Sequence, residues 1–196
     1  MKHDFSDVTS ENEAERLGRL YPIILEKHNV KWKEYFVEEK AFLQEVFGDT
    51  VLRINHIGST AVPGLIAKPT IDILLEIRED IDIADITGIM VAKGYIVNTP
   101  PIDIITYVKG YGPNGFVGQA FHIHVRRNGD WNELYFRDYL IAHPEVAKQY
   151  GTLKLGLKDV YEFDRDGYTA AKGEFVERIT VLARTEFKDK YKPVVE

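Results

Sequence analysis

The stretch HIGSTAVPGLIAKPTIDI, residues 56–73, decides the fold of this chain. Residues 50–57 and 70–77 alternate side chains in the manner of β-strands, and the Gly/Ser/Pro-rich segment 58–64 between them is typical of a turn. In the second strand the isoleucines point to one face and Asp72 points to the other. The sequence therefore predicts a strand–turn–strand unit in which Asp72 faces away from the main core.

The remaining secondary structure follows from the spacing of apolar side chains. Helices are expected where these side chains recur every 3.6 residues, and strands where they alternate. The expected helices are 11–20, a segment from Trp32 to a stop at Gly48, 82–93, a segment from Trp131, a segment after Pro144, and 165–186. The expected strands are 21–28, 103–109 and 119–127, the last two forming an antiparallel hairpin around the Gly-rich connection 110–118.

Length and composition place the chain among ordinary globular proteins. With 196 residues, 44% of them hydrophobic and 29% charged, it is long enough to bury one sizeable core. We expect a polar N-terminal leader over residues 1–20 and a single domain over residues 21–196. The leader has no apolar signal core, and no apolar run reaches membrane-spanning length, so no membrane partner is expected.

Charge and cysteine content exclude several functional classes. The formal net charge of -6 disfavours nucleic acid as the main partner, because binding a phosphate backbone needs a basic surface. The absence of cysteine excludes disulfides, thiolate metal sites and cysteine nucleophiles. Nothing indicates a secreted framework, so the expected location is the cytoplasm.

Two histidines of the expected strand 119–127 share one of its faces. His122 and His124 are two positions apart, and the apolar residues beside them take the buried parity. If this strand and the strand of Asp72 share a sheet, the three side chains surround one polar site that suits a divalent cation or a phosphate. The alternative is that the histidines are solvated or hydrogen-bonded groups on a half-exposed strand.

Several blocks of the sequence resemble the GrpB family. HIGSTAVPGLIAKPTIDI is similar to the family's signature, and FHIHV, FRDYLIAHPEVAKQY and DRDGYTAAKGEF resemble its later blocks, in the same order. The opening IILEKHNVKWKEYF is also similar to the family's start. The resemblance implies an α+β fold of the nucleotidyltransferase-like class, with a mixed sheet flanked by helices and with C-terminal helices. It also implies a family of poorly defined activity.

The acidic metal triad of working nucleotidyltransferases is incomplete here. Those enzymes resemble this chain in a Gly-Ser turn before a strand, and they carry two carboxylates at i and i+2, ~6.5 Å apart, that hold Mg²⁺. Position i is Asp72, but i+2 is Leu74, and Glu76 lies ~13 Å from Asp72 along the strand. Imidazole suits zinc, nickel or iron better than magnesium. We expect a divalent metal at Asp72, His122 and His124, which are also the catalytic candidates.

A second group of residues is expected to bind phosphate. Backbone amides after the Gly-Ser turn could hold an anion, and Arg and Lys supply charge. The candidate ligand-binding residues are His56, Gly58, Ser59, Thr60, Lys68, Arg137 and Lys172, with Arg165 as a further cation. The alternatives are a structural ion pair of Arg137 with Asp138 and a solvated helix face for Lys172. Tyr168 is expected to be a packing residue.

These features favour two functions of different classes. The first is an enzyme or former enzyme that binds a nucleotide or another phosphorylated small molecule, with nucleotidyl transfer as its most concrete form. The second is a noncatalytic accessory or binding module on a degenerate nucleotidyltransferase fold, which would have a protein partner. The missing second carboxylate favours it, as does the joining of GrpB-like domains to dephospho-coenzyme-A kinases in some proteins. A nucleic-acid binder is the least favoured interpretation because of the acidic charge.

Overall fold

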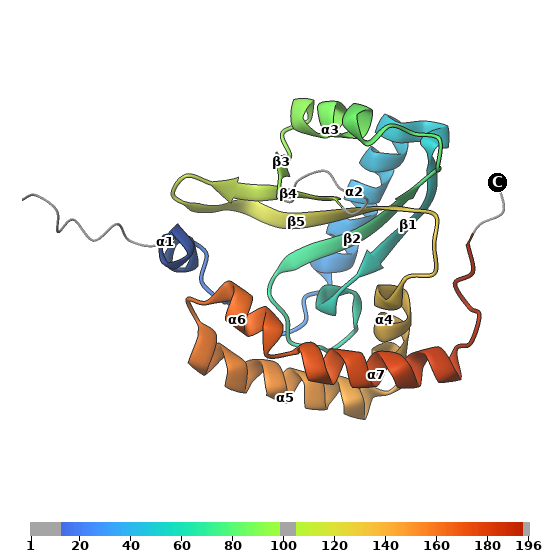
Figure 1. Cartoon of the computed structure of the whole chain (residues 1–196). Coiled ribbons are helices and arrows are strands. Elements are labelled where there is room, and N and C mark those ends of the chain that lie inside the picture. Colours follow the sequence, from blue (N-terminus) through green and yellow to red (C-terminus); the bar gives the residue numbers. More distant parts are fainter. Residues whose placement is uncertain (1–12, 99–104, 194–196) are drawn as a thin grey trace, which may run out of the picture.

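The fold is built on a five-stranded mixed sheet in the order β1-β2-β5-β4-β3 (Figure 1). A computed structural model describes residues 13–98 and 105–193. In chain order the elements are α1 (Glu13–Leu20), α2 (Lys31–Phe47), η1 (Gly48–Thr50), β1 (Val51–Ile57), η2 (Ser59–Ala61), β2 (Thr70–Ile77), α3 (Ile83–Ala92), β3 (Ile96–Val97), β4 (Ile105–Gly112), β5 (Gly115–Arg127), α4 (Asn132–Ala142), α5 (Pro144–Tyr161), α6 (Arg165–Ala170) and α7 (Gly173–Glu186). The predicted α+β class with C-terminal helices is confirmed.

Strand β2 lies inside the sheet, between β1 and β5. It pairs antiparallel with β1 and parallel with β5, so that Asp72 lies opposite His122 and Leu74 lies opposite His124. A strand covered on both faces needs an almost continuous apolar run, which residues 73–75 supply. Its parallel pairing needs a long crossover, and this connection contains α3, β3 and β4.

One face of the sheet packs against α2 and α3 (Figure 1). Alternate residues of β2 are fully buried there, because period-two side chains share a face. Burying one such side chain stabilises the fold by about 1.5–3 kcal/mol. The main contributors are Trp32, Leu43, Phe47, Ile71, Ile73, Leu75, Ile77, Ile86 and Met90.

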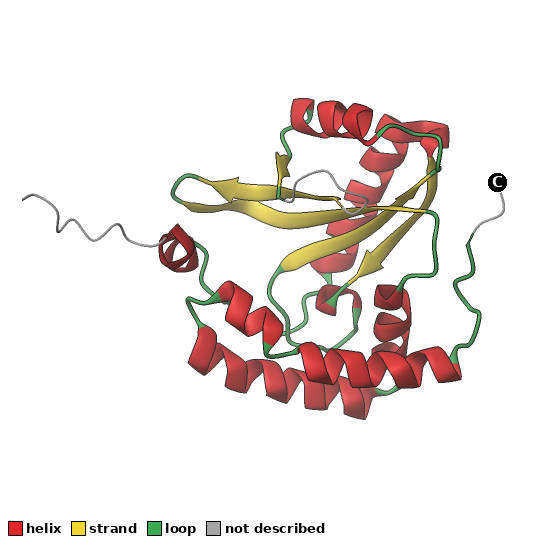
Figure 2. Cartoon of the chain, in the orientation of Figure 1, coloured by secondary structure: helices red, strands yellow, loops and turns green. Residues whose placement is uncertain are grey.

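The other face is covered by α4 at one end of β2 and borders a cleft at the other. Leu74 is fully buried in a cluster with Ile57 and Leu134. Figure 2 shows α5, α6 and α7 as a helical layer beneath the sheet, and Tyr150 and Ile179 belong to the apolar cluster of this layer. Leu74 thus occupies the position at which nucleotidyltransferases carry the second metal-binding carboxylate, and here it is a core residue.

A buried ion pair lies further along the same side of β2. Glu76 is fully buried and accepts hydrogen bonds from Arg53 Nε at 2.7 Å and from a second Arg53 nitrogen at 2.6 Å. The Trp131 indole and the Gly129 amide donate to the same carboxylate at 3.1 and 3.2 Å. A buried carboxylate needs such partners, and both Glu76 oxygens accept hydrogen bonds in this network. Glu76 therefore has a structural role in linking β2 to β1 and to the segment after β5.

Residues 21–28 do not form the predicted strand. They make one isolated bridge, in which Glu26 and Ala67 exchange backbone hydrogen bonds of 2.8 and 2.9 Å. The segment meets a loop, and not a strand edge, so the pairing cannot continue in either direction. The bridge nevertheless holds Glu26 beside the residue that precedes Lys68.

Two further boundaries differ from the sequence-based prediction. Most of the Gly-rich connection 110–118 continues β4 and β5, because Gly110, at φ +89°, accommodates an irregularity in the ladder between Lys109 and Tyr111. The predicted final helix 165–186 is interrupted between α6 and α7. Parts of the expected helix 11–20 and strand 103–109 lie outside the described residues. None of the described helices is both long enough and apolar enough to cross a membrane.

Candidate functional site

Asp72, His122 and His124 converge on one point of the sheet. The Oδ1 atom of Asp72 lies 3.3 Å from Nδ1 of His122 and 3.4 Å from Nε2 of His124. The parallel register is the cause, since it places His122 directly beside Asp72 and His124 two residues further along the same face. One carboxylate and two imidazole ligand atoms therefore lie within 4.8 Å of one another.

Neighbouring hydroxyl groups orient both imidazoles. The Oη atom of Tyr111 lies 2.7 Å from Nε2 of His122, and Oγ1 of Thr106 lies 3.4 Å from Nδ1 of His124. Each ring thus has a partner on the nitrogen that is not turned toward Asp72. This arrangement is typical of metal-binding histidines, whose outer nitrogen is held by a hydrogen bond.

The Gly-Ser turn approaches the carboxylate of Asp72 closely. Gly58 has φ 68° and ψ -173°, a backbone region that is essentially restricted to glycine. A Cβ atom at this position would lie 2.5 Å from Oδ2 of Asp72. The turn therefore requires glycine twice, for its backbone conformation and for the space beside the carboxylate.

The geometry of the three side chains fits a divalent cation. Ligand atoms bound tetrahedrally at about 2.0–2.2 Å from zinc lie about 3.4 Å apart, and the observed separations from Asp72 are 3.3 and 3.4 Å. Two imidazoles and one carboxylate also suit ferrous iron. Burial acts to raise the pKa of Asp72, but hydrogen bonds from His122 and His124 outweigh burial and lower that pKa, so the carboxylate is ionised.

A cleft of about 1200 Å³ lies beside this group. It is lined by the Gly-Ser turn, by β2 and β5, and by residues of α1, α5 and α6. Most residues predicted from the sequence line it, namely Gly58, Ser59, Thr60, Lys68, Asp72, His122, Arg165 and Lys172. Among the lining residues that sequence analysis did not predict are Tyr111, Tyr150 and Lys154.

Four cationic side chains line the cleft, those of Lys68, Lys154, Arg165 and Lys172. Burial and the neighbouring cations lower the pKa of all three lysines, to about 7 for Lys154 and about 8 for Lys172. Within residues 13–98 and 105–193, no carboxylate forms an ion pair with any of these lysines. Positive charge is thus concentrated without a protein counter-ion in contact, which favours binding of an anion.

Lys154 reaches the cleft through the C-terminal layer. Its residue surface is 3% exposed, and its ammonium donates to Oγ of Ser59 at 3.0 Å and to the carbonyl oxygen of Ile66. The ammonium also lies 4.8 Å from the ring centroid of Tyr150. The signal in the sequence is the i, i+4 spacing from Tyr150, which places Lys154 on the buried side of α5.

Lys172 borders the cleft because the last helix is interrupted before it. It lies between α6 and α7, with its ammonium 4.3 Å from the ring centroid of Tyr168. Tyr168 is buried, as expected of a packing residue, and it also lines the cleft. Burial raises the pKa of Tyr168 to about 12, and no described residue hydrogen-bonds to its hydroxyl.

Exposed carboxylates also line the cleft. They belong to Glu13 and Glu15 of α1 and to Asp164 and Asp166 at the start of α6. Asp164 caps this helix by accepting a hydrogen bond of 2.8 Å from the Gly167 amide. The lysines are more buried than these carboxylates, so the positive charge is held in the less hydrated part of the cleft.

Arg137 lies apart from the cleft lining. Its guanidinium pairs with Asp138 at 2.7 Å and donates to the carbonyl oxygen of His56 at 2.8 Å and to the hydroxyl of Tyr191 at 2.7 Å. This is the structural ion pair that the sequence offered as the alternative for Arg137. Its interactions tie α4 to β1 and to the segment after α7.

His56 supports the turn from the opposite face of the sheet. Its ring stacks on Phe36 with centroids 4.8 Å apart, and its Nε2 atom lies 3.0 Å from Oγ1 of Thr60. The Thr60 hydroxyl in turn donates to the carbonyl oxygen of Thr70 at 2.9 Å. Burial lowers the pKa of His56 to about 4, so the ring is neutral and orients the turn without adding charge to the cleft.

Comparison with known proteins agrees with the motifs. The family model described as GrpB protein matches residues 22–181. The chain belongs to the GrpB family. The UPF0157 protein YqkA of Bacillus subtilis (strain 168) is 38% identical over 165 residues, which are 80% of this chain and 47% of YqkA. The chain therefore spans about half the length of that GrpB-related protein.

Solved structures extend the comparison to the fold. The crystal structure of the conserved protein GrpB from Enterococcus faecalis has a TM-score of 0.72 at 28% identity, over 84% of this chain and 99% of that chain. A more distant likeness is to the Cid1 poly(U) polymerase bound to MgATP, with a TM-score of 0.45 at 12% identity over 66% of this chain and 45% of that chain. The similarity to the Enterococcus faecalis structure confirms the GrpB fold that the motifs predict.

Lys154 should make the stability of this GrpB-family chain depend on pH. Its pKa is about 7 in the folded chain and about 10.4 in the unfolded chain, so between these values the unfolded chain binds the extra proton. We expect the free energy of unfolding to rise with pH in this window, by up to about 1.4 kcal/mol per pH unit from this one proton. Below pH about 7 both states are protonated and the cost of burying the ammonium is complete.

Urea unfolding between pH 7 and 9.5, in a buffer without phosphate, measures this dependence. The Lys154→Met variant should show a shallower rise, because the titrating group is removed while much of its packing is kept. The Lys158→Met variant is the control, since Lys158 is on the same helix and makes only a partly exposed i, i+4 pair with Glu162. Equal slopes for the wild type and Lys154→Met would show that Lys154 has an ordinary pKa.

Proposed function

We propose that this protein binds a nucleotide or another phosphorylated small molecule in the cleft, together with a divalent cation at Asp72, His122 and His124. The observation that carries this proposal is the gathering of three lysines and one arginine beside a group that could hold a metal ion, in a chain of net charge -6. Such a concentration is costly for the fold, because like charges repel and burial removes hydration. A bound phosphate would relieve both costs.

The phosphate groups would lie between the Gly-Ser turn and the C-terminal helices. Lys68, Lys172 and Arg165 line the walls of the cleft, and Lys154 would act through its hydrogen bond to Ser59. Arginine can bind phosphate oxygens bidentately, and lysine acts as a point charge. The cation at Asp72 would supply Lewis-acid stabilisation of a phosphoryl oxygen. In the enzymatic form of the proposal, nucleotidyl transfer, the turn would position the phosphates for attack.

A noncatalytic binding module is the second candidate. The observation in its favour is Leu74, which fills the position of the second carboxylate and is fully buried. A site with one carboxylate and two imidazoles differs from the Mg²⁺ site of working nucleotidyltransferases, so binding without turnover is compatible with the geometry. Both candidates share the ligand, and only an assay of product formation separates them.

Thermal and calorimetric titration test the shared part of the proposal. We expect ATP, GTP or tripolyphosphate to stabilise the purified protein, by about 2.7 kcal/mol at a concentration of 100 times the Kd. Adding Zn²⁺ or Mn²⁺ should strengthen this effect. The Lys172→Gln variant should lose most of the affinity for each ligand, and Lys158→Gln, which changes a half-buried lysine outside the cleft lining, should keep it.

The Asp72→Asn variant separates the cation from the phosphate groups. It keeps the shape of the side chain and removes the charge that a cation needs, so only the metal-dependent part of the affinity should disappear. A loss of stability with unchanged metal-dependent binding would identify Asp72 as a structural hydrogen-bond acceptor. A screen in which neither nucleotides nor tripolyphosphate bind would contradict the proposed function.

A further inference from the structure

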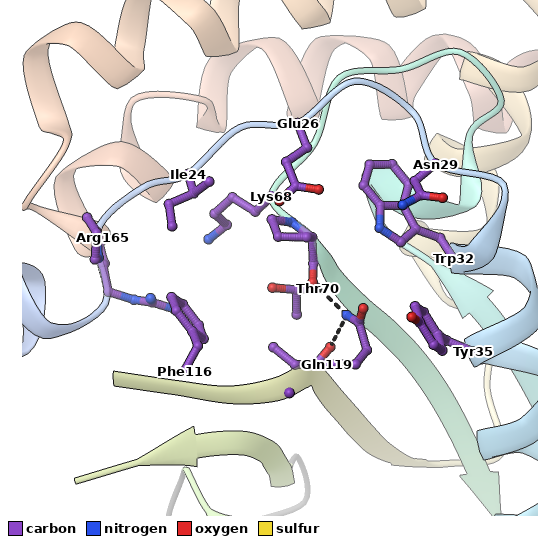
Figure 3. A pocket seen from close by; sticks show the side chains of 14 residues that line it. Ile24, Glu26, Asn29, Trp32, Tyr35, Lys68, Thr70, Phe116, Gln119 and Arg165 are labelled. Carbon is purple, nitrogen blue, oxygen red and sulfur yellow. Dashed lines mark hydrogen bonds between the residues drawn. The ribbon is translucent and has the colours of Figure 1, made fainter. Parts of the chain in front are cut away.

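A second pocket, of about 460 Å³, adjoins the cleft (Figure 3). The two share Lys68, Thr70 and Arg165 in their linings, so one ligand can extend from the cationic cleft into the pocket. The volume lies within the range of about 300–1,000 Å³ that is usual for small-molecule sites. Sequence analysis did not single out this pocket, because its walls come from α2, β5 and the irregular segment that precedes α2.

Aromatic side chains form two sides of the pocket. Figure 3 shows Trp32 and Tyr35 of α2 on one side and Phe116 of β5 on the other. Phe116 is held by Tyr21 and Tyr111, whose ring centroids lie 5.2 and 5.3 Å from its own. Trp32 is only 1% exposed, so Tyr35 and Phe116 offer the accessible aromatic surface, which is suited to contact with a flat ring.

Polar groups in the pocket retain unused hydrogen-bonding capacity. The side-chain amide of Gln119 donates to the carbonyl oxygens of Pro69 at 2.6 Å and Ala120 at 3.0 Å, which leaves its carbonyl oxygen as an acceptor (Figure 3). The side-chain oxygen of Asn29 accepts from the Lys31 amide at 3.0 Å, which leaves its NH₂ group as a donor.

Glu26 adds a charged acceptor at the junction with the cleft. Its backbone is fixed by the bridge to Ala67, and its side chain lines the pocket near Lys68 (Figure 3). Within the described residues, nothing hydrogen-bonds to or ion-pairs with this carboxylate. A carboxylate is unsuited to receive more phosphate, but it binds N–H donors strongly. The pocket thus adds a charged acceptor beside Lys68 and Arg165, the two cations that it shares with the cleft.

We infer that this pocket holds the amino-bearing heterocyclic base of a nucleotide whose phosphates lie in the cleft. This inference rests on the proposed function and specifies the ligand of the same site. The flat ring would contact the aromatic side chains of Tyr35 and Phe116, and its exocyclic amino group would donate to Glu26 and Gln119. The Asn29 amide donates to a ring nitrogen or carbonyl. Adenine, guanine and cytosine carry such an amino group, and uracil and hypoxanthine do not.

Calorimetric titration of the full chain with matched ligands tests the inference. The probes are ATP, GTP and CTP, which carry an amino group, against ITP, UTP and tripolyphosphate, which do not. We expect the first three to bind at least about tenfold more tightly, the effect of one hydrogen bond to a charged group. Equal affinity of all six would overturn the inference and leave phosphate binding in place. No binding by any of the six would overturn the proposed function as well.

Two variants assign the preference to the pocket. Glu26→Gln should reduce the affinity for ATP, GTP and CTP by about tenfold. The same variant should leave the affinity for tripolyphosphate unchanged or higher, because a negative charge near Lys68 is removed. Phe116→Leu removes one aromatic wall at an exposed position and should weaken the same three nucleotides without affecting tripolyphosphate. Parallel losses for nucleotides and tripolyphosphate in both variants would contradict a base-binding role.

Discussion

Replacing Gly58 with alanine is expected to lower the free energy of unfolding by about 2–5 kcal/mol and to abolish the metal binding that we propose at Asp72. The backbone conformation at φ 68° is strained for any residue with a Cβ atom, and the added atom would meet Oδ2 of Asp72 at 2.5 Å. The carboxylate must then move, and it leaves the position from which it contacts His122 and His124. Urea unfolding measures the first effect, and calorimetric titration with Zn²⁺ measures the second.

Gly64→Ala is the matched control for this substitution. Gly64 also has a positive φ, +76°, but no atom lies within 4 Å of the Cβ that alanine would add. The Gly64→Ala variant should lower the free energy of unfolding only by the backbone strain, about 1–2 kcal/mol, and should bind Zn²⁺ like the wild type. If Gly58→Ala is no less stable than Gly64→Ala and binds Zn²⁺ normally, the carboxylate of Asp72 is not held by the turn.

The Arg53→Met variant is expected to lose about 3–5 kcal/mol of stability. Glu76 has no exposed surface, and the variant would remove both hydrogen bonds that it accepts from the guanidinium. Only the donors from Trp131 and Gly129 would remain for a buried charge. Denaturant unfolding at neutral pH measures the loss.

Two comparisons show whether the cost comes from the orphaned charge. The double variant Arg53→Met/Glu76→Leu removes both charges and should recover much of the stability, because an apolar pair can replace a buried ion pair. Breaking the partly exposed pair of Lys158 and Glu162 with Lys158→Met should cost less than about 1 kcal/mol. A single variant Arg53→Met that unfolds like Lys158→Met would mean that water reaches Glu76.

The convergence of Asp72, His122 and His124 was predicted in part from strand parity, which is a local property of the sequence. Each side chain's face follows from its neighbours on the same strand, and only the pairing of β2 with β5 had to be assumed. The metal and catalytic roles of the three residues stay predictions. The same reasoning placed Gly58 and Lys68 near the site, since both lie in the segment that leads into β2.

Features that depend on packing between distant elements could not be read in this way. Lys154 contacts Ser59 across 95 positions of sequence, and a lysine on an amphipathic helix is ordinarily solvated. The failed strand over residues 21–28 has a related cause, because its apolar residues pack without a neighbouring strand edge to pair with. Arg137 has a side chain of the type that binds phosphate. Its hydrogen bonds to His56 and Tyr191 depend on how α4 packs in the fold, which the sequence does not reveal.

The parallel pairing of β2 with β5 also determines when the site forms during folding. Asp72 and His124 are 52 positions apart, whereas β1 and β2 are joined by the shorter connection 58–69. Closing the longer loop costs more chain entropy before stabilising contacts form. We therefore expect the β1–β2 pair to form first and the β2–β5 ladder to form more slowly. In a partly folded chain, the Gly-Ser turn and Asp72 would be in place, but neither histidine would yet lie beside Asp72. The complete ligand set is therefore a property of the native state alone, and a metal ion would bind the chain only after the topology has been completed.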